Sequence, residues 1–300
     1  MITEISKNIV CLYHGNCSDG HASAAIVKMY YSQPQYEQYN FFLIPGEYSN
    51  NDILEQVMAH TPTELIIVDF SFKEHEMDDL VQFHNTSVMN VTWIDHHLSA
   101  SKYPAWNSLL KGIRSLEKSG CELTWQYFYP QQEPPEIIKL IGDHDTWKFQ
   151  YGDRTRYLSA AFQENPPHPI HDYDFWKSTL SNESIESYIE QGKSIKSLID
   201  IQVKKSYNTG INMLWHGYKT RCMNSGVNIS DTGNYAVQNG YDIGMVWSVR
   251  GDRVVVSLRS QLDTDVSELA KKYNGGGHKN AAAFNMSISE FFKEIYNGTK

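Results

Sequence analysis

The chain has 300 residues and a formal net charge of -9, and it contains no lysine or arginine block longer than a pair. Proteins that hold long duplex nucleic acid through many phosphates usually present a basic face, so this composition argues against binding of long duplexes. No apolar run approaches the roughly 18 residues that suggest a membrane span, and the amino terminus lacks the apolar core of a signal peptide. We therefore expect a cytoplasmic protein without a membrane partner.

The four cysteines are Cys11, Cys17, Cys121 and Cys222, and no two of them form a Cys-x-x-Cys pair. Because they lie far apart, the sequence argues against a disulfide framework and against a zinc site built from thiolates. We expect the cysteines to be reduced and most of them to be buried.

Apolar runs that predict strands alternate with helical patterns in the first third of the chain. The strand runs cover residues 8–13, 39–44, 64–70 and 91–94, and the helical patterns cover residues 22–31, 51–60 and 74–84. Asn50 or Asn51 is the expected cap of the second helix. The continuous apolar run of residues 64–70 suits the middle of a parallel sheet. The alternation predicts a doubly wound, mostly parallel α/β sheet with right-handed crossovers.

Polar side chains follow three of these strand runs at the point where each run ends. His14 and Asp19 follow the first, Asp69 ends the third, and Asp95-His96-His97 follows the fourth. Open parallel sheets bind their ligands at this edge, so we expect these side chains to share a site. A helical pattern over residues 135–142 leads into a further acidic cluster, residues 143–147, which is the natural fourth contributor.

The composition and pattern of the sequence change after about residue 150. Residues 164–174 are rich in Pro, His and Asp, and residues 183–205 form a long helical pattern that we interpret as a connector. Two β-like runs, a helix over residues 265–273 and a glycine-rich segment that leads into an alanine-rich helix follow. We predict a metal-binding catalytic domain over residues 1–180, a helical linker over 181–208 and a smaller α/β substrate-binding domain over 209–300.

The donor types at the predicted sheet edge are carboxylates and imidazoles without thiolates. Such donors suit manganese or magnesium, and the mixture of Asp and His favours manganese. An acid between two ions roughly 3.5–4 Å apart can bridge them, and such a pair can activate water and stabilise a leaving phosphoryl oxygen. We expect two manganese ions, with magnesium as the alternative, and Asp69 as the bridging ligand.

Five motifs occur along the chain in a fixed order, and together they resemble a known family. They are His14…Asp19-Gly20, Ile67-Val68-Asp69, Asp95-His96-His97, Asp143 with Asp145, and Ser257-Leu258-Arg259-Ser260…Asp265-Val266…Gly275-Gly276-Gly277-His278…Ala281-Ala282-Ala283-Phe284. Over nearly its whole length the chain resembles the DHH phosphoesterase superfamily with its DHH-associated carboxy-terminal domain, which includes RecJ-like, nano-RNase and exopolyphosphatase-type phosphohydrolases.

The resemblance implies a role for individual residues. The metal ligands would be His14, Asp19, Asp69, His96 and Asp143. Asp95 would orient a histidine, as ligating imidazoles usually require, and His97 would contact the scissile phosphate. The far phosphate or terminal nucleotide would be held by Arg259, Gly275, Gly276, Gly277 and His278.

One position departs from the pattern of the family. Many relatives carry a second acid two residues after the aspartate of the first motif, and His21 stands there in this chain. Either His21 is a substitute ligand or one metal binds weakly or not at all. The choice between Asp143 and Asp145 as a ligand also stays open, because the sequence does not say which side chain turns inward.

These observations predict a manganese-dependent phosphodiesterase. It would act on short single-stranded oligonucleotides, as an exonuclease does, or on nucleotide phosphates, by attack of metal-activated water. One alternative is a hydrolase of polyphosphate or pyrophosphate, which needs the same ions but no pocket for a base. Another is a non-catalytic sensor of a phosphorylated ligand, which His21 in place of an acid would suit.

Overall fold

A computed structural model describes residues 7–103, 109–163, 165–261 and 263–296. The chain divides into two compact units, Met1–Ile195 and Lys196–Lys300. The predicted division into residues 1–180, 181–208 and 209–300 places a linker where the structure has a single boundary, and the assignment of these domains stays a prediction.

The first unit is built on a parallel sheet of four strands. These are β1 (Asn8–His14), β2 (Asn40–Gly46), β3 (Glu64–Val68) and β4 (Asn90–Ile94), in the order β2-β1-β3-β4. Every neighbouring pair is parallel. The predicted parallel sheet is confirmed, and the apolar run that the sequence places at its middle is β3.

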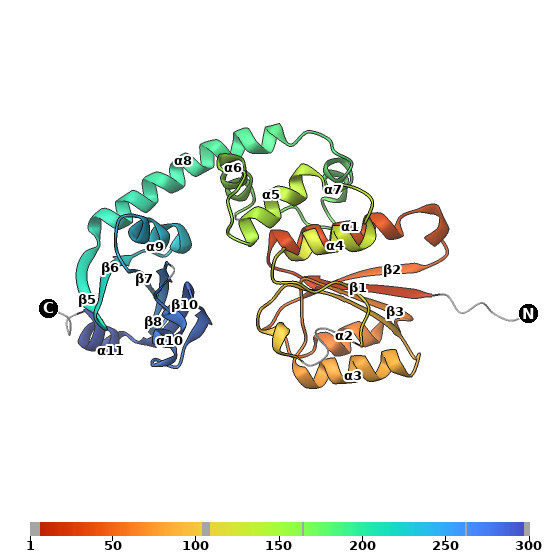
Figure 1. Cartoon of the computed structure of the whole chain (residues 1–300), viewed down its shortest axis with the longest axis horizontal. Helices are drawn as coiled ribbons and strands as arrows, with labels where there is room; N and C mark the ends of the chain where they lie inside the picture. The colour runs from red at the N-terminus through yellow and green to blue at the C-terminus, as the bar shows by residue number, and fades with distance from the viewer. Residues whose placement is uncertain (1–6, 104–108, 164, 262, 297–300) are drawn as a thin grey trace, which may run out of the picture. The chain divides into compact units, whose positions relative to one another are not determined.

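Helices cover both faces of this sheet, as Figure 1 shows: α1 (Ser18–Tyr31) and α4 (Gly120–Phe128) on one face, α2 (Ile53–Ala59) and α3 (Glu74–Asn85) on the other. Successive residues of a strand point to opposite faces. Accordingly Ile67 packs in the core that includes α2 and α3, whereas Ile66 packs in the core that includes α1. Burial on both faces explains why the strands read as continuous apolar runs.

A second helical layer lies beyond α1 and α4. It contains α5 (Glu136–Asp145), α6 (Asp153–Phe162) and α7 (Tyr173–Leu180), which share a hydrophobic core with α1 and α4 around Trp125 and Trp176. Residues 165–174 join this layer, because the Pro167 carbonyl accepts the Trp176 indole N–H at 3.0 Å. This segment lies within residues 1–180, the range predicted for the first domain.

The described part of the first unit also contains two short 3₁₀ segments, η1 (Pro34–Tyr36) and η2 (Ala100–Lys102). The expected cap of α2 was wrong, since Asp52 precedes the helix and Asn50 Oδ1 accepts the Asp52 N–H at 2.9 Å to form a turn. The long predicted helix is α8 (Glu186–Thr209), which crosses the boundary between the units. Within the described residues, no helix combines the length and apolar character needed to cross a membrane.

The second unit is built on a mixed sheet of six strands. They are β5 (Ile211–Trp215), β6 (Tyr218–Asn224), β7 (Ile243–Arg250), β8 (Arg253–Ser260), β9 (Gly276–His278) and β10 (Ala281–Ser287), in the order β5-β6-β7-β8-β10-β9. Among the described residues of this sheet, only β6 and β7 pair in parallel. The remaining elements are α9 (Ile229–Gln238), α10 (Val266–Lys271), α11 (Ile288–Glu290) and the π-helical turn η4 (Phe291–Tyr296).

The alanine-rich segment after the glycines is a strand, so the predicted helix there was wrong. Alternate residues of β10, Ala282, Phe284 and Met286, are buried in the core of the unit. A period of two is the pattern of a strand with one buried face, and it outweighs the helical propensity of alanine. Gly275 permits the close approach of the preceding segment, because an added Cβ would lie 2.2 Å from the Ala283 carbonyl oxygen.

Candidate metal centre

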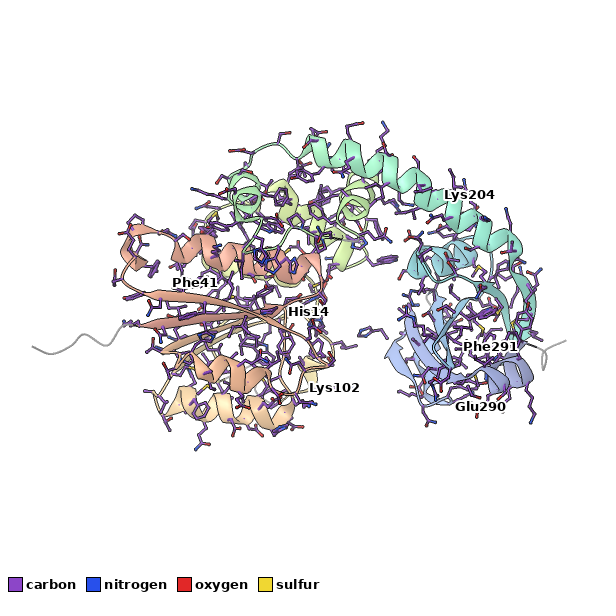
Figure 2. The ribbon with its side chains drawn as sticks, turned by 180° about the vertical axis from the view of Figure 1, so that it is seen from behind. His14, Phe41, Lys102, Lys204, Glu290 and Phe291 are labelled. Atoms are coloured by element: carbon purple, nitrogen blue, oxygen red, sulfur yellow. The ribbon has the colours of Figure 1, made fainter. Side chains whose placement is uncertain are left out.

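Three parallel strands end at one edge of the first sheet and release polar residues there. His14 is the last residue of β1, Asp69 follows β3, and Asp95 follows β4. Figure 2 shows His14 at the end of the sheet opposite Phe41. The first turn of α1 adds Asp19. The structure therefore brings these side chains together at the carboxyl edge of the sheet, where the sequence predicts them.

Asp69 lies at the centre of this group. Its Oδ2 atom is 3.6 Å from His14 Nδ1. Its Oδ1 atom is 3.1 Å from His96 Nε2 and 3.9 Å from His97 Nδ1. Two sets of donor atoms lie within 4.8 Å of one another, one from His14, Asp69 and His97, the other from Asp19, Asp69 and His96. Asp69 belongs to both sets, which is what a carboxylate between two ions must do.

The backbone at Asp69 directs its side chain into the cluster. The residue has a φ of 53°, in the left-handed region that few residues other than glycine adopt. Its N–H donates to the Ile94 carbonyl at 3.0 Å, which ties the turn to the end of β4. Strained backbone of this kind concentrates at functional sites. The Asp69 side chain is only 1% exposed.

Asp19 is held by the amino terminus of α4. Its Oδ2 accepts the Gly120 N–H at 2.7 Å, and its Oδ1 accepts the Cys121 N–H at 2.9 Å. The start of a helix carries partial positive charge and favours an anion. Only glycine fits at the first helical position, because an added Cβ on Gly120 would lie 2.6 Å from the Asp69 Cβ.

Asp145, in the last turn of α5, completes a set of three carboxylates. Its Oδ2 lies 3.5 Å from His96 Nε2, and Asp19 Oδ2 lies 3.6 Å from the same nitrogen. Burial, followed by the charge of Asp69, raises the pKa of Asp19 above its usual range. Burial, followed by the charge of Asp19, raises the pKa of Asp145 in the same way. Crowded carboxylates of this kind are typical of sites that bind divalent cations, so the residues fit the expected metal.

The histidines balance part of this negative charge. Burial alone would lower the pKa of His96, but its hydrogen bond to Asp69 and the charges of Asp19 and Asp145 raise it to about 10. Burial alone would raise the pKa of Asp69, but hydrogen bonds from His14 and His96 hold it well below its usual range. Without a metal, a protonated imidazole thus supplies the positive charge in the centre of the cluster.

Asp95 holds His97 in place. It is fully buried, and its Oδ1 accepts the His97 Nδ1–H at 2.7 Å and the His96 backbone N–H at 2.8 Å. The Ser71 hydroxyl donates to its other oxygen. Burial alone would lower the pKa of His97, but the hydrogen bond and charge of Asp95 raise it. With Nδ1 engaged in this way, His97 has its Nε2 atom available to a ligand.

Asp143 and Asp145 point to different partners. Asp143 is buried, its Oδ1 accepts the Gln150 N–H at 2.8 Å, and its Oδ2 accepts the Tyr151 N–H at 3.2 Å. The Thr155 hydroxyl donates to the same Oδ2. These bonds fix the segment between α5 and α6. The structure therefore places Asp145 beside the cluster and gives Asp143 a structural set of partners.

His21 lies in α1 with both ring nitrogens facing backbone carbonyls. Its Nε2 is 2.8 Å from the Gly15 oxygen and its Nδ1 is 3.1 Å from the Pro167 oxygen. The residue is 6% exposed. This placement joins the loop after β1 to the helical layer, and it leaves no ring nitrogen of His21 directed at the carboxylates.

Three residues of the site were missed in the sequence. Cys17 Sγ lies 3.3 Å from Asp69 Oδ2 and 3.4 Å from His14 Nδ1. Its only sequence signal is its position two residues before Asp19. Burial, with the charges of Asp69 and Asp19, raises the pKa of this thiol. Gly120 shows its role only through the long-range contact with Asp69. The third residue is Tyr48.

The Tyr48 ring lies between the cluster and a neighbouring pocket. Its centroid is 5.5 Å from that of His14 and 6.0 Å from that of His97, and it stacks on Phe70 at 4.7 Å. The pocket has a volume of about 280 Å³, and its lining includes Tyr48, Phe70, Lys73, Trp93, Lys102 and Tyr103. Glu47, Glu74 and Glu76 also line it. The exposed Tyr48 ring suits contact with a nucleobase, and the lysines suit a phosphate attached to it.

In the second unit, the sheet register brings Arg259 and the glycine-rich segment together. Arg259 pairs with Ala281 across β8 and β10, and Ala281 pairs with His278 across β10 and β9. Directly paired residues share one face of a sheet. Arg259 Nη2 donates to Ser230 Oγ at 2.6 Å, and among the described residues no carboxylate pairs with this guanidinium. The small Ala281 side chain leaves room between Arg259 and His278, and we call this surface the Arg259 face.

The raised pKa of His96 predicts how pH affects metal binding. The folded-state pKa of His96 is about 10, above its ordinary value of 6.5. The charged imidazole therefore stabilises the folded protein fully below about pH 6.5, and this stabilisation is lost as the pH rises to about 10. A metal must displace this proton. Apparent manganese affinity should therefore rise about tenfold per pH unit over this range, as measured by calorimetric titration. Affinity that does not change with pH would contradict the assignment, and His96→Gln should flatten the dependence.

The contacts of Asp143 and Asp145 predict opposite effects of the same substitution. Asp145→Asn should weaken manganese affinity by about 10- to 100-fold while leaving the metal-free fold intact. Asp143→Asn should lower the free energy of unfolding by about 1–3 kcal/mol, because its partners lose a charged acceptor, with little effect on affinity. Metal titration and thermal denaturation of both variants measure the two effects. The reverse pattern would show that Asp143 is the ligand.

The sequence also matches known proteins. Residues 229–297 match the DHHA1 domain family. The chain is 31% identical over 304 aligned residues to uncharacterized protein R106 of Acanthamoeba polyphaga mimivirus, covering 93% of this chain and 67% of that protein.

Solved structures share the fold. A Vibrio pGpG-specific phosphodiesterase, PggH, has a TM-score of 0.53 at 14% identity, with 96% of each chain covered. The exonuclease RecJ bound to manganese has a TM-score of 0.54 at 13% identity, with 95% of this chain and 87% of that chain covered. The domain match and the shared fold confirm the resemblance carried by the motifs, and the chain belongs to the DHH phosphoesterase superfamily.

Proposed function

We propose that this protein is a manganese-dependent phosphodiesterase that acts on short oligonucleotides or nucleotide phosphates. The observation that carries the proposal is the position of Asp69, which two sets of donor atoms share. Such a centre suits hydrolysis of a phosphate ester, because two bound ions polarise the phosphoryl oxygen and activate the attacking water. The exonuclease and phosphodiesterase of the same fold support a phosphohydrolase of this class.

Individual residues can be assigned as ligands of the two ions in such a centre. We assign His14 to one ion, Asp19, His96 and Asp145 to the other, and Asp69 to both. His97, the third member of the first set, is assigned to the phosphate, because its Nδ1 already bonds Asp95. The donors assigned here to the two ions are oxygen and nitrogen atoms, and at the position with Asp19, His96 and Asp145 they favour manganese over calcium, with magnesium as the alternative. Manganese in the RecJ structure supports this choice.

His97 and Asp95 contribute to binding and orientation. Asp95 fixes the His97 ring through Nδ1, so that Nε2 can donate a hydrogen bond to an oxygen of the scissile phosphate. Because Asp95 is fully buried, the orientation of the ring does not depend on solvent. In this proposal the His97 imidazole, whose pKa is raised, would face the negative charge that develops during hydrolysis.

Two features support a nucleotide substrate over polyphosphate. The pocket beside the cluster offers the exposed Tyr48 ring, supported from behind by Phe70, for stacking on a base, which polyphosphate does not need. In the second unit, the Arg259 face offers a guanidinium without a carboxylate partner among the described residues, which suits a substrate phosphate. We assign metal chemistry to the first unit and recognition of the substrate end to the second. The net charge of -9 argues for short substrates.

A panel of substrates tests the proposed function. With manganese, the protein should release nucleotides from short RNA or DNA oligomers or from a linear dinucleotide, and removal of the metal should abolish release. Asp69→Asn should lower the rate by at least about 10²–10³-fold, because the shared ligand is lost. Asp79→Asn, at an exposed position of α3, is the matched control and should retain activity.

The outcome of the panel separates the alternatives. Release of phosphate from polyphosphate alone would replace the nucleotide proposal with a polyphosphatase. Bound manganese with no turnover of any substrate would favour a sensor. Near-normal activity of Asp69→Asn would contradict the shared-ligand scheme.

Arg259→Ala tests recognition by the second unit. Loss of a charged contact to phosphate should raise KM by about 10- to 100-fold, with a smaller effect on kcat, as steady-state kinetics would measure. Arg253→Ala is the matched control, because Arg253 lies on the same strand and bonds Asn285 instead. A fall in kcat alone, with KM unchanged, would contradict the role of Arg259 in binding.

A further inference from the structure

The strongest unassigned feature of the molecule is the position of the Cys17 thiol inside the metal centre. Three donor atoms form a compact triangle there. Cys17 Sγ is 3.4 Å from His14 Nδ1 and 3.3 Å from Asp69 Oδ2. The third side, between His14 Nδ1 and Asp69 Oδ2, is 3.6 Å.

This triangle has the dimensions of one face of a tetrahedral metal site. Metal–sulfur distances of about 2.3 Å and metal–nitrogen or metal–oxygen distances of about 2.0–2.2 Å place neighbouring ligand atoms about 3.4–3.6 Å apart. The three observed separations lie close to this range. Sulfur, nitrogen and oxygen atoms are thus already arranged as ligands of one ion.

We propose that Cys17 is a metal ligand, and that His14, Cys17 and Asp69 form a sulfur-containing site for a thiophilic divalent cation of the zinc and cobalt class. The inference rests on the proposed function in one respect, namely that Asp69 is shared between two ions. The neighbouring position, formed by Asp19, Asp69, His96 and Asp145, contains only oxygen and nitrogen donors and keeps its preference for manganese or magnesium. The two positions of the centre therefore differ in metal preference.

A purely structural role does not account for a cysteine at this position. Cys17 precedes α1 as its N-cap, and its Sγ accepts the Gly20 N–H at 3.3 Å. Sulfur is a weak acceptor, and Ser, Thr, Asp or Asn caps a helix better. The thiol instead contacts His14 and Asp69, so its sulfur atom lies among the donor atoms of the metal centre.

The other cysteines do not meet this description. Cys11 and Cys222 are buried within β1 and β6, and Cys121 Sγ lies 3.4 Å from Ser119 Oγ and 3.9 Å from the Ile138 carbonyl oxygen. Cys17 alone among the four has both a histidine nitrogen and a carboxylate oxygen within 3.5 Å of its sulfur. When the sulfur–metal bond forms, the thiol proton leaves to solvent, so binding needs no other reactant.

Cobalt spectroscopy tests the proposal without reference to activity. Cobalt(II) added to the metal-free full-length protein should produce a near-ultraviolet sulfur-to-cobalt charge-transfer band that saturates with one equivalent. Cys17→Ser and Cys17→Asp should abolish the band. Both replacements preserve a good N-cap, so thermal denaturation should show intact folding. Cys11→Ala is the matched control and should keep the band.

Metal preference gives a second measurement. Cys17→Asp replaces sulfur by oxygen, so the ratio of cobalt to manganese affinity should fall by at least about tenfold. An unchanged ratio, or a charge-transfer band that persists in Cys17→Ser, would overturn the proposal. So would the absence of a band in wild-type protein that has bound cobalt.

The two proposals fail in different ways. A wild-type band together with no turnover of any substrate would overturn the phosphodiesterase function and leave Cys17 as a ligand. Manganese-dependent turnover of nucleotides together with no band at saturating cobalt would support the phosphodiesterase function and overturn the role of Cys17 as a ligand. Cys17 would then act only as the N-cap of α1.

Discussion

The rest of the structure depends on one electrostatic constraint, the crowding of Asp19, Asp69 and Asp145 at a largely buried edge of the sheet. Buried like charges are costly unless positive charge meets them. Two features supply positive charge: the start of α4 lies against Asp19, and His96, whose pKa is raised, lies between the carboxylates. A site of neutral residues would need neither of these sources of positive charge. The constraint therefore explains why a cation, rather than a further side chain, is the natural occupant.

Much of the fold could be predicted because its strands are buried on both faces. Continuous apolar runs mark such strands, and polar residues at their ends mark the edge where His14, Asp69 and Asp95 emerge. The alanine-rich strand β10 escaped prediction, because alanine favours helices and the deciding contacts come from the core of the second unit. Propensity was outweighed there by burial at every second residue.

The parts of the site that could not be predicted depend on rotation and distance. Asp143 and Asp145 are two residues apart at the end of α5, so they point about 200° apart around the helix axis. A rotation of the helix by roughly half a turn would exchange their roles, and the sequence does not fix that rotation. Gly120 matters only because α4 returns to Asp69 from a distant part of the chain, and no local pattern reveals such a contact. Cys17 was set aside because cysteines were judged by their spacing to one another, whereas its partners are a histidine and an aspartate.

The bonds from Gly120 and Cys121 to Asp19 join segments that are 101 and 102 residues apart. Closing so long a loop costs conformational entropy, and contacts of this range form late and slowly in folding. The four strands are therefore not sufficient to assemble the centre during synthesis, since α4 must emerge and dock before Asp19 is held. A metal bound as proposed would link the earliest and latest parts of the site, so it would stabilise the fold as well as take part in the reaction.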